Sequence, residues 1–387
     1  MKKVRIGMIG AGVMASLHMD NIKKTKNAEL TAVCDVDLEK AKTAGKKYNC
    51  KVFGDHKELL NGKVCDAVMI ATPHYFHTTI GIDALNAEHH VLVEKPISVH
   101  KSDCERLIAA HKNKKNKKLV FAAMFNMRTD PHYKKIKQLI DSGELGELIR
   151  VTWIITNWFR TDAYFASGSW RATWKGEGGG VLLNQCPHQL DLFQWICGMP
   201  KKVHGFCSIG KRHDIEVEDE VTAYMEYKNG ATGVFITSTG EAPGTNRLEI
   251  AGERGKVVFE NDTLTFIRNE VLANKFIKTS EKPFARPDVW NITIPIKGNG
   301  GRHAEILQNF VNAISKGEKL IAPAEEGIRS VELGNAILYS SMTAKPVEMP
   351  LNSRAYEKML KELIEKSKFI KKTVKKTDGD IGKSFNE

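Results

Sequence analysis

The N-terminal run VRIGMIGAGVMA restricts the possible folds more than any other part of the sequence. Its apolar stretch, Val4–Ile9, predicts a buried strand, and Gly10-Ala11-Gly12 follows directly, ahead of a helical pattern. Glycine at the first position permits a tight turn, glycine at the second lets backbone approach a pyrophosphate, and the small Ala15 allows close packing of helix on strand. The run predicts a dinucleotide-binding loop, with a flavin or nucleotide-sugar Rossmann domain as the alternative.

The residues around this loop indicate which dinucleotide it binds. The backbone amides of Val13 and Met14 open the predicted helix, where amides bind phosphates. Asp35 follows the second predicted strand, about twenty residues past the loop, where a carboxylate accepts hydrogen bonds from an adenine-ribose 2′-hydroxyl. The same carboxylate repels a 2′-phosphate, and the next two residues supply no arginine to neutralise one. The sequence therefore favours NAD over NADP.

Residues 1–122 alternate short apolar runs with amphipathic stretches such as Leu38–Tyr48 and Thr78–Asn86. This pattern is typical of parallel strands joined by crossover helices, so we expect an α/β fold that begins with a doubly wound Rossmann sheet. The predicted strands are Val4–Ile9, Leu30–Cys34, Lys51–Phe53, Ala67–Ala71, His90–Val93 and Leu119–Ala123.

From residue 123 the pattern changes to an antiparallel meander with turn signals such as Lys228-Asn229-Gly230. We predict a second α/β domain over residues 123–350, built on a large, mostly antiparallel sheet. A helix at Tyr133–Ser142 precedes its first strand. The predicted strands are Ile149–Thr156, Val203–Ser208, Val221–Tyr227, Thr232–Thr237, Arg247–Ala251 and Lys256–Glu260.

The C-terminal part of the sequence predicts three more helices. Those at Ala304–Ser315 and Ala324–Met342 are expected to cover one face of the second sheet. In residues 351–387 an amphipathic helix, Tyr356–Phe369, precedes a basic tail with too few apolar residues to order itself.

The composition is that of a globular protein. Of the 387 residues, 42% are apolar and 27% are charged, and no stretch has the roughly eighteen uninterrupted apolar residues that a membrane helix needs. We therefore expect a soluble protein with no membrane partner. The seven cysteines are scattered and never spaced C-x-x-C, which favours a reducing cytoplasm and predicts neither disulfides nor a metal site.

The net charge of +12 raises the question of a nucleic-acid partner. Much of it falls in Lys112–Lys118 and around Lys366–Lys376, and the interior has no helix-turn-helix, zinc-finger or aromatic RNA-binding signature. A solvated helix end and a basic tail explain the charge, so we expect no nucleic-acid partner.

Two motifs end neighbouring strands of the predicted parallel sheet: Ala71-Thr72-Pro73 and Glu94-Lys95-Pro96. The carboxyl ends of such strands line the crevice where ligands bind, so Lys95 is directed at the nicotinamide end of the cofactor rather than at solvent. The predicted cofactor-binding residues are Gly10, Gly12, Val13, Met14, Asp35, Thr72, Pro73, His77, Glu94 and Lys95.

The segment KGEGGGVLLNQCPHQLD, from Lys175 to Asp191, admits two interpretations. In one, the glycines make a sharp turn into a buried helix and His188 is a core residue. In the other, the glycines bring backbone to the active site and His188 faces the cofactor.

In combination these motifs resemble the Gfo/Idh/MocA oxidoreductases, the family of glucose-fructose oxidoreductase and inositol dehydrogenase. The resemblance covers nearly the whole chain, including Asn126–Gly146 at the opening of the second domain. It implies a Rossmann domain, a second α/β domain that binds substrate and whose large open sheet often mediates oligomers, and an active site between the two. For this chain we expect a homodimer or homotetramer.

The resemblance also implies a catalytic set: the lysine of E-K-P, and an Asp and a His from a pattern close to G-G-G-x-L-x-D-x-G-x-H-x-x-D. These positions fall on Lys95, Asn184 and His188. The chain departs from the pattern in having Asn184 for the Asp, Cys186 for a Gly, and His74 where Asn is common after the Thr-Pro pair.

Oxidation of a secondary alcohol by NAD needs a base for the hydroxyl proton and a donor that orients the oxygen. We assign the base to His188, because imidazole titrates near neutral pH, and the donor to Lys95. Asn184 cannot ionise, so it is expected to orient substrate or His188 through its amide.

The segment NWFRTDAYFASGSWRATW, ahead of the glycines, is rich in aromatic and arginine side chains. Aromatic faces stack on sugar rings and arginine bonds hydroxyls, although core or interface packing explains any single Trp equally well. The predicted substrate-binding residues are Asn126, Arg128, Trp158, Arg160, Tyr164, Trp170, Arg171 and Trp174.

We therefore expect an NAD-dependent dehydrogenase acting on a secondary ring hydroxyl of a sugar or glycoside, with C3 of a pyranoside as the favoured position. A myo- or scyllo-inositol dehydrogenase is the first alternative. A non-catalytic regulator that senses dinucleotide and sugar is the second, and the presence of both Lys95 and His188 argues against it.

Overall fold

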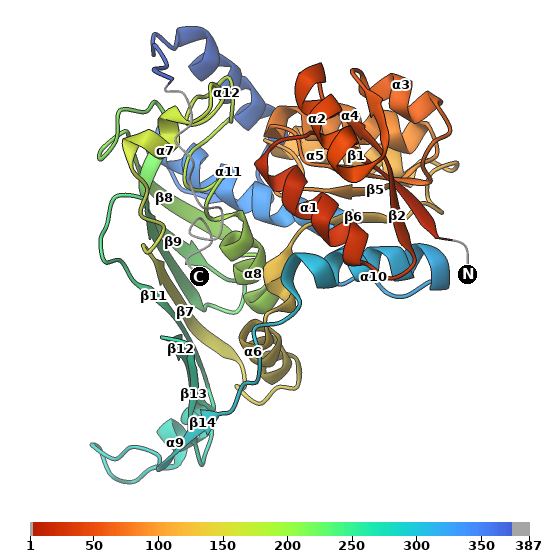
Figure 1. The fold of residues 1–387 in the computed structure, drawn as a ribbon. Coiled ribbons are helices and arrows are strands. Elements are labelled where there is room, and N and C mark those ends of the chain that lie inside the picture. Colours follow the sequence, from red (N-terminus) through yellow and green to blue (C-terminus); the bar gives the residue numbers. More distant parts are fainter. Residues whose placement is uncertain (1–2, 374–387) are drawn as a thin grey trace.

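The computed structural model describes residues 3–373, which form two β-sheets, each with its own hydrophobic core (Figure 1). The first sheet has six parallel strands in the order β3-β2-β1-β4-β5-β6, the strand order of a Rossmann domain. All six predicted strands are confirmed, with small differences at their ends. They are β1 (Val4–Ile9), β2 (Ala28–Cys34), β3 (Lys51–Phe53), β4 (Ala67–Ile70), β5 (His90–Val93) and β6 (Phe121–Ala123).

Local sequence explains how these strands connect. Gly10 has a φ of +99°, and a Cβ there would lie 2.5 Å from the carbonyl oxygen of Ala71, so only glycine fits between β1 and β4. Asp37 and Asp55 cap the next two helices by accepting backbone hydrogen bonds. The connecting helices are α1 (Val13–Lys24), α2 (Leu38–Tyr48), α3 (His56–Asn61), α4 (His74–Asn86) and α5 (Lys101–Lys112).

The second sheet has nine strands in the order β14-β13-β12-β11-β7-β10-β9-β8-β15. Its pairs are antiparallel except β7 with β10, which confirms a mostly antiparallel sheet. The last three strands in the chain are additional to those predicted. The nine are β7 (Leu148–Ile155), β8 (Lys202–Ile209), β9 (Glu218–Glu226), β10 (Thr232–Ser238), β11 (Asn246–Gly252), β12 (Gly255–Glu260), β13 (Thr263–Asn269), β14 (Val289–Ile294) and β15 (Val347–Glu348).

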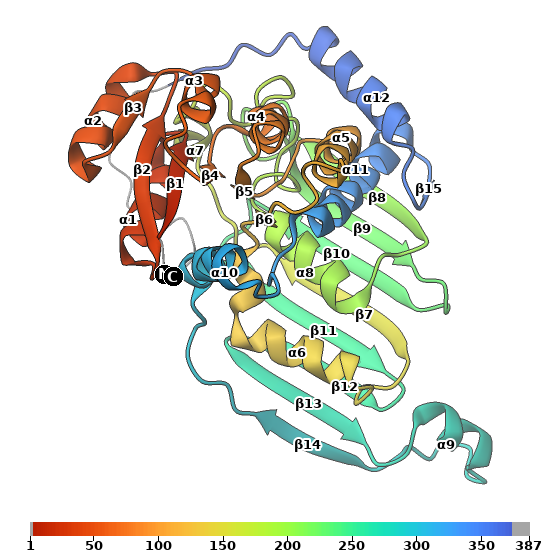
Figure 2. The same cartoon turned by 90° about the vertical axis from the view of Figure 1, so that its right-hand side faces the viewer.

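Among residues 3–373, helices cover only the face of this sheet that is turned toward the Rossmann domain, and they leave the opposite face open (Figures 1 and 2). The covering helices are α6 (Pro131–Asp141), α8 (Pro187–Cys197) and α11 (Gly327–Thr343). The shorter elements and the final helix are η1 (Asn126–Thr129), α7 (Asp162–Ala166), α9 (Ala273–Thr279), η2 (Ala324–Glu326) and α12 (Ser353–Lys366).

One helix lies elsewhere than expected. The sequence predicts that helices near 304–315 and 324–342 both cover the second sheet, which is confirmed for α11 and wrong for α10 (Arg302–Lys316). Leu307 and Phe310 of α10 are buried in the first core, where the helix packs against α1 and β1 (Figure 2). The chain therefore returns to the Rossmann domain before it crosses again to the second sheet.

The C-terminal prediction is only partly open to comparison. The predicted helix corresponds to α12, whereas most of the basic tail, residues 374–387, lies outside the described residues. Within residues 3–373, no helix combines the length and apolar character needed to cross a membrane.

Candidate active site

The glycine loop and the first turn of α1 form an open cradle. Gly12 is exposed, and a Cβ at this position would meet no atom within 4 Å. No side chain of the described residues caps α1, which leaves the amides of Val13 and Met14 available to a ligand. These residues fit a pyrophosphate.

Asp35 lies at the end of β2, beside the same loop. Its carboxylate accepts hydrogen bonds from the backbone N of Ala11 at 2.7 Å and of Asp37 at 2.8 Å. Each carboxylate oxygen has a second lone pair, so Asp35 retains acceptor capacity for a ribose hydroxyl. Its position fits the predicted role in NAD binding.

The turn after β4 carries Thr72 and Pro73. The Thr72 Oγ1 atom is buried without a hydrogen-bond partner in the described part of the chain, as expected of a group that meets a ligand. His77 was expected to bind the cofactor, and this expectation is wrong. Its fully buried ring has Nε2 2.7 Å from the carbonyl oxygen of Thr72 and Nδ1 2.7 Å from that of Pro96, so it ties two strand ends together.

Glu94 is buried against α1 and fixes the turn that carries Lys95. Its Oε1 lies 2.6 Å from Nε2 of His18, and its Oε2 accepts the backbone N of Lys95 at 3.0 Å. Burial acts to raise the pKa of Glu94, but the hydrogen bond with His18 and the charges of His18, His303 and Lys95 outweigh it and lower that pKa to about 2. His18 is not predictable as a site residue, because one histidine on an apolar helix face matches no motif.

The three predicted catalytic residues converge from separate parts of the chain. Lys95 follows β5, Asn184 ends the glycine-rich turn, and His188 lies in the first turn of α8. Lys95 Nζ donates a hydrogen bond to the backbone oxygen of Asn184 at 2.8 Å. His188 is 8% exposed, and its Nδ1 is buried without a partner in the described residues, which leaves Nε2 as the accessible nitrogen.

The surroundings set the protonation of these groups. Burial, followed by the positive charge of Lys95, lowers the pKa of His188 well below its ordinary value. Burial also lowers the pKa of Lys95, against the opposing effect of the Glu94 and Glu177 carboxylates. At neutral pH the His188 imidazole is therefore neutral and able to accept a proton.

The glycines before Asn184 serve close packing as well as a turn. A Cβ on Gly180 would lie 2.0 Å from the backbone oxygen of Glu218 on β9, and Gly178 has a φ of +86°. The Glu218 carboxylate accepts hydrogen bonds from the backbone N of Gly180 at 2.8 Å and of Leu182 at 3.1 Å. The turn is thereby fixed to the second sheet, and its end reaches Lys95.

Arg128 was expected to bind substrate, and the structure corrects this. Its Nε and Nη2 each donate to Asp191 at 2.7 Å, and its Nη1 donates to Glu326 at 2.5 Å, with only 1% of the residue exposed. The guanidinium links η1 to α8 and η2, and so helps to hold α8, the helix that carries His188, in position. Asn126, also on η1, is buried with its Oδ1 unpartnered in the described residues, and its role stays a prediction.

The remaining aromatic and arginine residues form a ladder. The guanidinium of Arg160 lies over the rings of Trp158 and Tyr164, and that of Arg171 lies over the rings of Tyr164 and Trp170. The separations are 4.6 to 5.4 Å from guanidinium carbon to ring centroid. Such alternation holds the side chains in fixed planes.

The Tyr164 hydroxyl connects this ladder to the predicted catalytic residues. It accepts hydrogen bonds from Arg171 Nη1 at 2.9 Å and Gln185 Nε2 at 3.2 Å, and it lies 3.5 Å from Oδ1 of Asn184. The predicted substrate segment and the predicted catalytic residues are therefore one connected site.

Two residues near the ladder differ from expectation. Trp174 was expected to bind substrate, but it is 5% exposed and packs in the second core, with its backbone oxygen accepting the Tyr75 hydroxyl at 2.8 Å. His74, noted only as a departure from the family pattern, meets the edge of Trp170 at 5.4 Å between ring centroids. Burial, with nearby positive charge, lowers the pKa of His74 well below its ordinary value.

Glu177, the residue before the glycine triplet, also belongs to the site although no motif predicts it. It is 1% exposed, and its Oε2 accepts the backbone N of Ala172 at 2.6 Å while its Oε1 accepts Nδ2 of Asn184. The available signal was a single acidic residue inside an otherwise apolar, glycine-rich segment.

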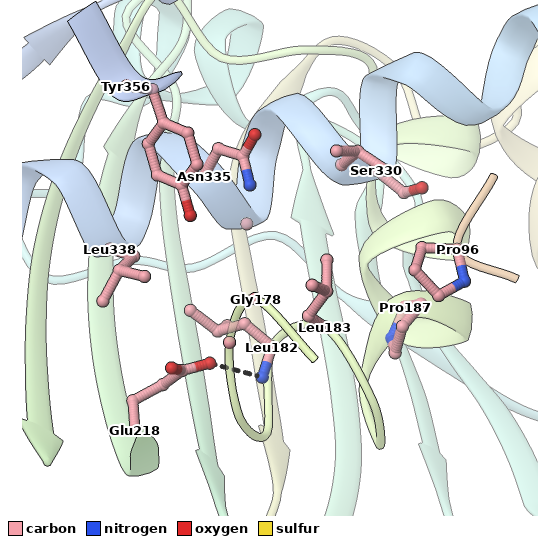
Figure 3. A pocket seen from close by; sticks show the side chains of 13 residues that line it. Pro96, Gly178, Leu182, Leu183, Pro187, Glu218, Ser330, Asn335, Leu338 and Tyr356 are labelled. Carbon is pink, nitrogen blue, oxygen red and sulfur yellow. Dashed lines mark hydrogen bonds between the residues drawn. The ribbon is translucent and has the colours of Figure 1, made fainter. Parts of the chain in front are cut away.

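A separate cavity lies behind the glycine-rich turn, between it and α11 (Figure 3). Its volume of about 10 Å³ is near that of one water molecule, so it does not accommodate a sugar. The carboxylate of Glu218 lies at its wall, bonded to the backbone N of Leu182 (Figure 3). Burial raises the pKa of Glu218 to about 7.

Comparison with known protein families covers both domains. Residues 4–123 match the oxidoreductase family with an NAD-binding Rossmann fold, and residues 133–258 match the GFO/IDH/MocA C-terminal domain. The chain belongs to the Gfo/Idh/MocA family. This confirms the resemblance inferred from the motifs and identifies an NAD-binding oxidoreductase with the expected α/β fold.

Several known proteins are similar to this chain over most of its length. Myo-inositol 2-dehydrogenase of Thermotoga maritima is 26% identical over 357 residues, which cover 89% of this chain and 98% of that protein. The WlbA dehydrogenase from Bordetella pertussis, in complex with NADH and UDP-GlcNAcA, has a TM-score of 0.76 and 25% identity, covering 91% of this chain and 100% of that one. Levoglucosan dehydrogenase, in complex with NADH and L-sorbose, shares the fold with a TM-score of 0.75 and 21% identity, covering 91% and 100%.

Proposed function

We propose that the protein is an NAD-dependent dehydrogenase that oxidises a secondary ring hydroxyl of a sugar, glycoside or cyclitol. The observation that carries the proposal is the hydrogen bond from Lys95 Nζ to the backbone oxygen of Asn184, in the turn that leads into His188. Burial and the charge of Lys95 lower the pKa of His188, which keeps its imidazole neutral. A proton acceptor beside a cationic hydrogen-bond donor is what an alcohol oxidation needs. The relatives with named activities are dehydrogenases of an inositol and of carbohydrates.

The residues divide the reaction between them. Lys95 Nζ binds the substrate hydroxyl oxygen and stabilises the negative charge that develops there. His188 Nε2 accepts the hydroxyl proton as the carbon–hydrogen bond breaks and a carbonyl forms. Bound NAD supplies the hydride acceptor. Asn184, held at both ends of its amide, orients the substrate or the imidazole.

The ladder of Trp158, Arg160, Tyr164, Arg171 and Trp170 supports a substrate larger than free inositol. Flat aromatic faces bind the apolar face of a pyranose or of an aglycone, and the guanidinium edges donate to hydroxyl groups. We therefore propose a pyranoside, oxidised at C3. Inositol oxidation is the second candidate, favoured by the full-length similarity to myo-inositol 2-dehydrogenase.

The test is a panel of inositols, free hexoses and glycosides assayed for NADH production, with NMR of the product to locate the new carbonyl. Turnover of glycosides with a carbonyl at C3 supports the proposal. Activity confined to inositols supports the second candidate. No activity on any compound, together with binding of NAD and sugar, would point instead to a regulator.

Asp35 is proposed to select NAD over NADP. Asp35→Asn removes the charge that repels a 2′-phosphate, and its amide oxygen can still accept one of the two backbone hydrogen bonds, from Ala11 or from Asp37. We expect the ratio of the NADP and NAD dissociation constants to fall by about tenfold or more, the equivalent of one charge-assisted hydrogen bond. Titration of tryptophan fluorescence measures both constants. Asp37→Asn, at the N-terminus of α2, is the control, and equal affinities in the wild type would contradict the assignment.

We also propose that the open face of the second sheet joins copies of this chain. Outward-facing residues of β8 and β9 include Phe206 and Tyr224, which are 57% and 41% exposed. Exposed aromatic side chains on a paired sheet are typical of a protein interface. A homodimer or homotetramer is the assembly that a self-complementary sheet face favours.

A further inference from the structure

Glu177 is a buried carboxylate inside the site for which the reaction above has no use. It is 1% exposed and accepts two hydrogen bonds, from the backbone N of Ala172 to Oε2 at 2.6 Å and from Nδ2 of Asn184 to Oε1. A carboxylate kept out of water in this way needs compensating charge. Burial, the largest effect, raises the pKa of Glu177, and the positive charges of Arg171 and Lys95 act in the opposite direction.

Asn184 links Glu177 to Lys95. Its side-chain Nδ2 donates to Glu177, its Oδ1 lies 3.5 Å from the Tyr164 hydroxyl, and its backbone oxygen accepts Lys95 Nζ at 2.8 Å. The amide orientation is therefore set by Glu177, because only Nδ2 can donate to a carboxylate.

We propose that the carboxylate of Glu177, which accepts a hydrogen bond from the Asn184 amide, provides the negative charge that the family pattern places on an Asp at position 184. Glu177 is a positioning residue: it orients the Asn184 amide and helps to keep Lys95 in the ammonium form. The proposal rests on the proposed function for its kinetic consequences, but its effect on Lys95 exists without substrate.

Lys95 is surrounded by titratable groups from every element packed against it. Burial disfavours its charged form most strongly; among its neighbours Glu94 has the largest favourable effect, Arg171 opposes the charge, and Glu177 and Cys186 favour it again. The histidines whose own titration responds to Lys95 are His74, His77, His188 and His303. Removing the charge of Glu177 therefore shifts the balance toward the free amine of Lys95.

The hydrogen bonds predict how three variants behave. In Glu177→Gln the one remaining oxygen has to serve both Ala172 and Asn184, so one bond is lost along with the charge. In Asn184→Asp two carboxyl groups face each other at hydrogen-bond distance, and one has to take up a proton. In the double variant the introduced amide oxygen accepts from Ala172 and the amide nitrogen donates to the introduced carboxylate, which restores both bonds and one charge.

The first experiment measures the reactivity of Lys95 toward an amine-specific reagent from pH 7 to 10, followed by peptide mass spectrometry. Glu177→Gln is expected to raise the Lys95 labelling rate near pH 8 by about threefold or more, since a fall of one pKa unit gives about ten times more free amine. Glu218→Gln is the matched control: Glu218 is a second buried carboxyl, on β9, and it binds the same turn through the backbone N of Gly180 and Leu182 instead of through Asn184. An unchanged rate in Glu177→Gln, or an equal rise in Glu218→Gln, overturns the proposal.

The second experiment measures kcat/KM against pH for the same variants. Each single variant is expected to lose about tenfold or more, and the double variant to recover most of that loss, a strongly non-additive result. Additive losses, with normal folding by circular dichroism, overturn the proposal. If the wild type oxidises no sugar, glycoside or cyclitol, the proposed function fails while the labelling result still decides the role of Glu177.

Discussion

Replacing His188 by alanine is expected to lower kcat by about a hundredfold or more, while the dissociation constant for NAD stays within about twofold. The imidazole is the accessible proton acceptor beside Lys95, and alanine leaves the hydroxyl proton with no acceptor. The glycine loop and Asp35, which carry the predicted NAD contacts, lie on the other domain and are untouched. Steady-state kinetics and fluorescence titration of NAD measure the two quantities.

A matched control is His74→Asn. His74 is also buried, also has a lowered pKa, and lies against Trp170, but it is not assigned a proton. We expect it to alter KM more than kcat. A parallel loss of NAD binding in His188→Ala would show instead that His188 is a core residue, which is the other interpretation of its segment.

The assignment of His188 as the proton acceptor also predicts how folding stability and kcat/KM depend on pH. Burial and Lys95 lower the pKa of His188 well below its ordinary value, so the folded protein holds it neutral where the unfolded chain is protonated. The contribution of His188 to the free energy of unfolding is therefore fully present above a pH of about 6.5 and is lost as the pH falls below it. The acid limb of kcat/KM should likewise lie below about 6.5, and a limb near 7 would contradict the lowered pKa.

The parallel sheet was predictable because its strands are continuous apolar runs separated by helices. The second sheet was harder to predict at its β14 edge, because β14 is exposed on much of its length and has little apolar pattern. The placement of α10 failed for another reason. An apolar stripe shows that a helix is covered, but it does not show which of two cores covers Leu307 and Phe310.

The candidate site shows the same limit at the level of side chains. Lys95, Asn184 and His188, whose catalytic roles stay predictions, could be proposed from the sequence because motifs fix their positions at strand and helix ends. Arg128 and Trp174 were misassigned because sequence gives a residue type but not the direction of its side chain, which here is inward. Glu177 was missed because its importance arises from a hydrogen bond to Asn184, a contact that no spacing rule specifies.

Lys95→Met is expected to have the largest effect of any single change, a loss of about 10²–10³ in kcat, the magnitude of removing one preorganised donor at a developing alkoxide. Methionine fills the volume but cannot bind the substrate oxygen or the backbone oxygen of Asn184. Lys95→Arg keeps the charge yet is not expected to restore activity, because a planar guanidinium does not replace a compact ammonium.

The pH profile separates this role from simple structural damage. Burial lowers the pKa of Lys95, so the wild-type kcat/KM should decline on the alkaline side at a pH below the ordinary lysine value of about 10.5. Above that pH the free amine no longer stabilises the alkoxide as an ammonium does. In Lys95→Met the residual activity should lack this limb, while NAD still binds through the glycine loop. If the alkaline decline persists in Lys95→Met, it belongs to another titratable group. Lys95 would then not be the ammonium that stabilises the alkoxide.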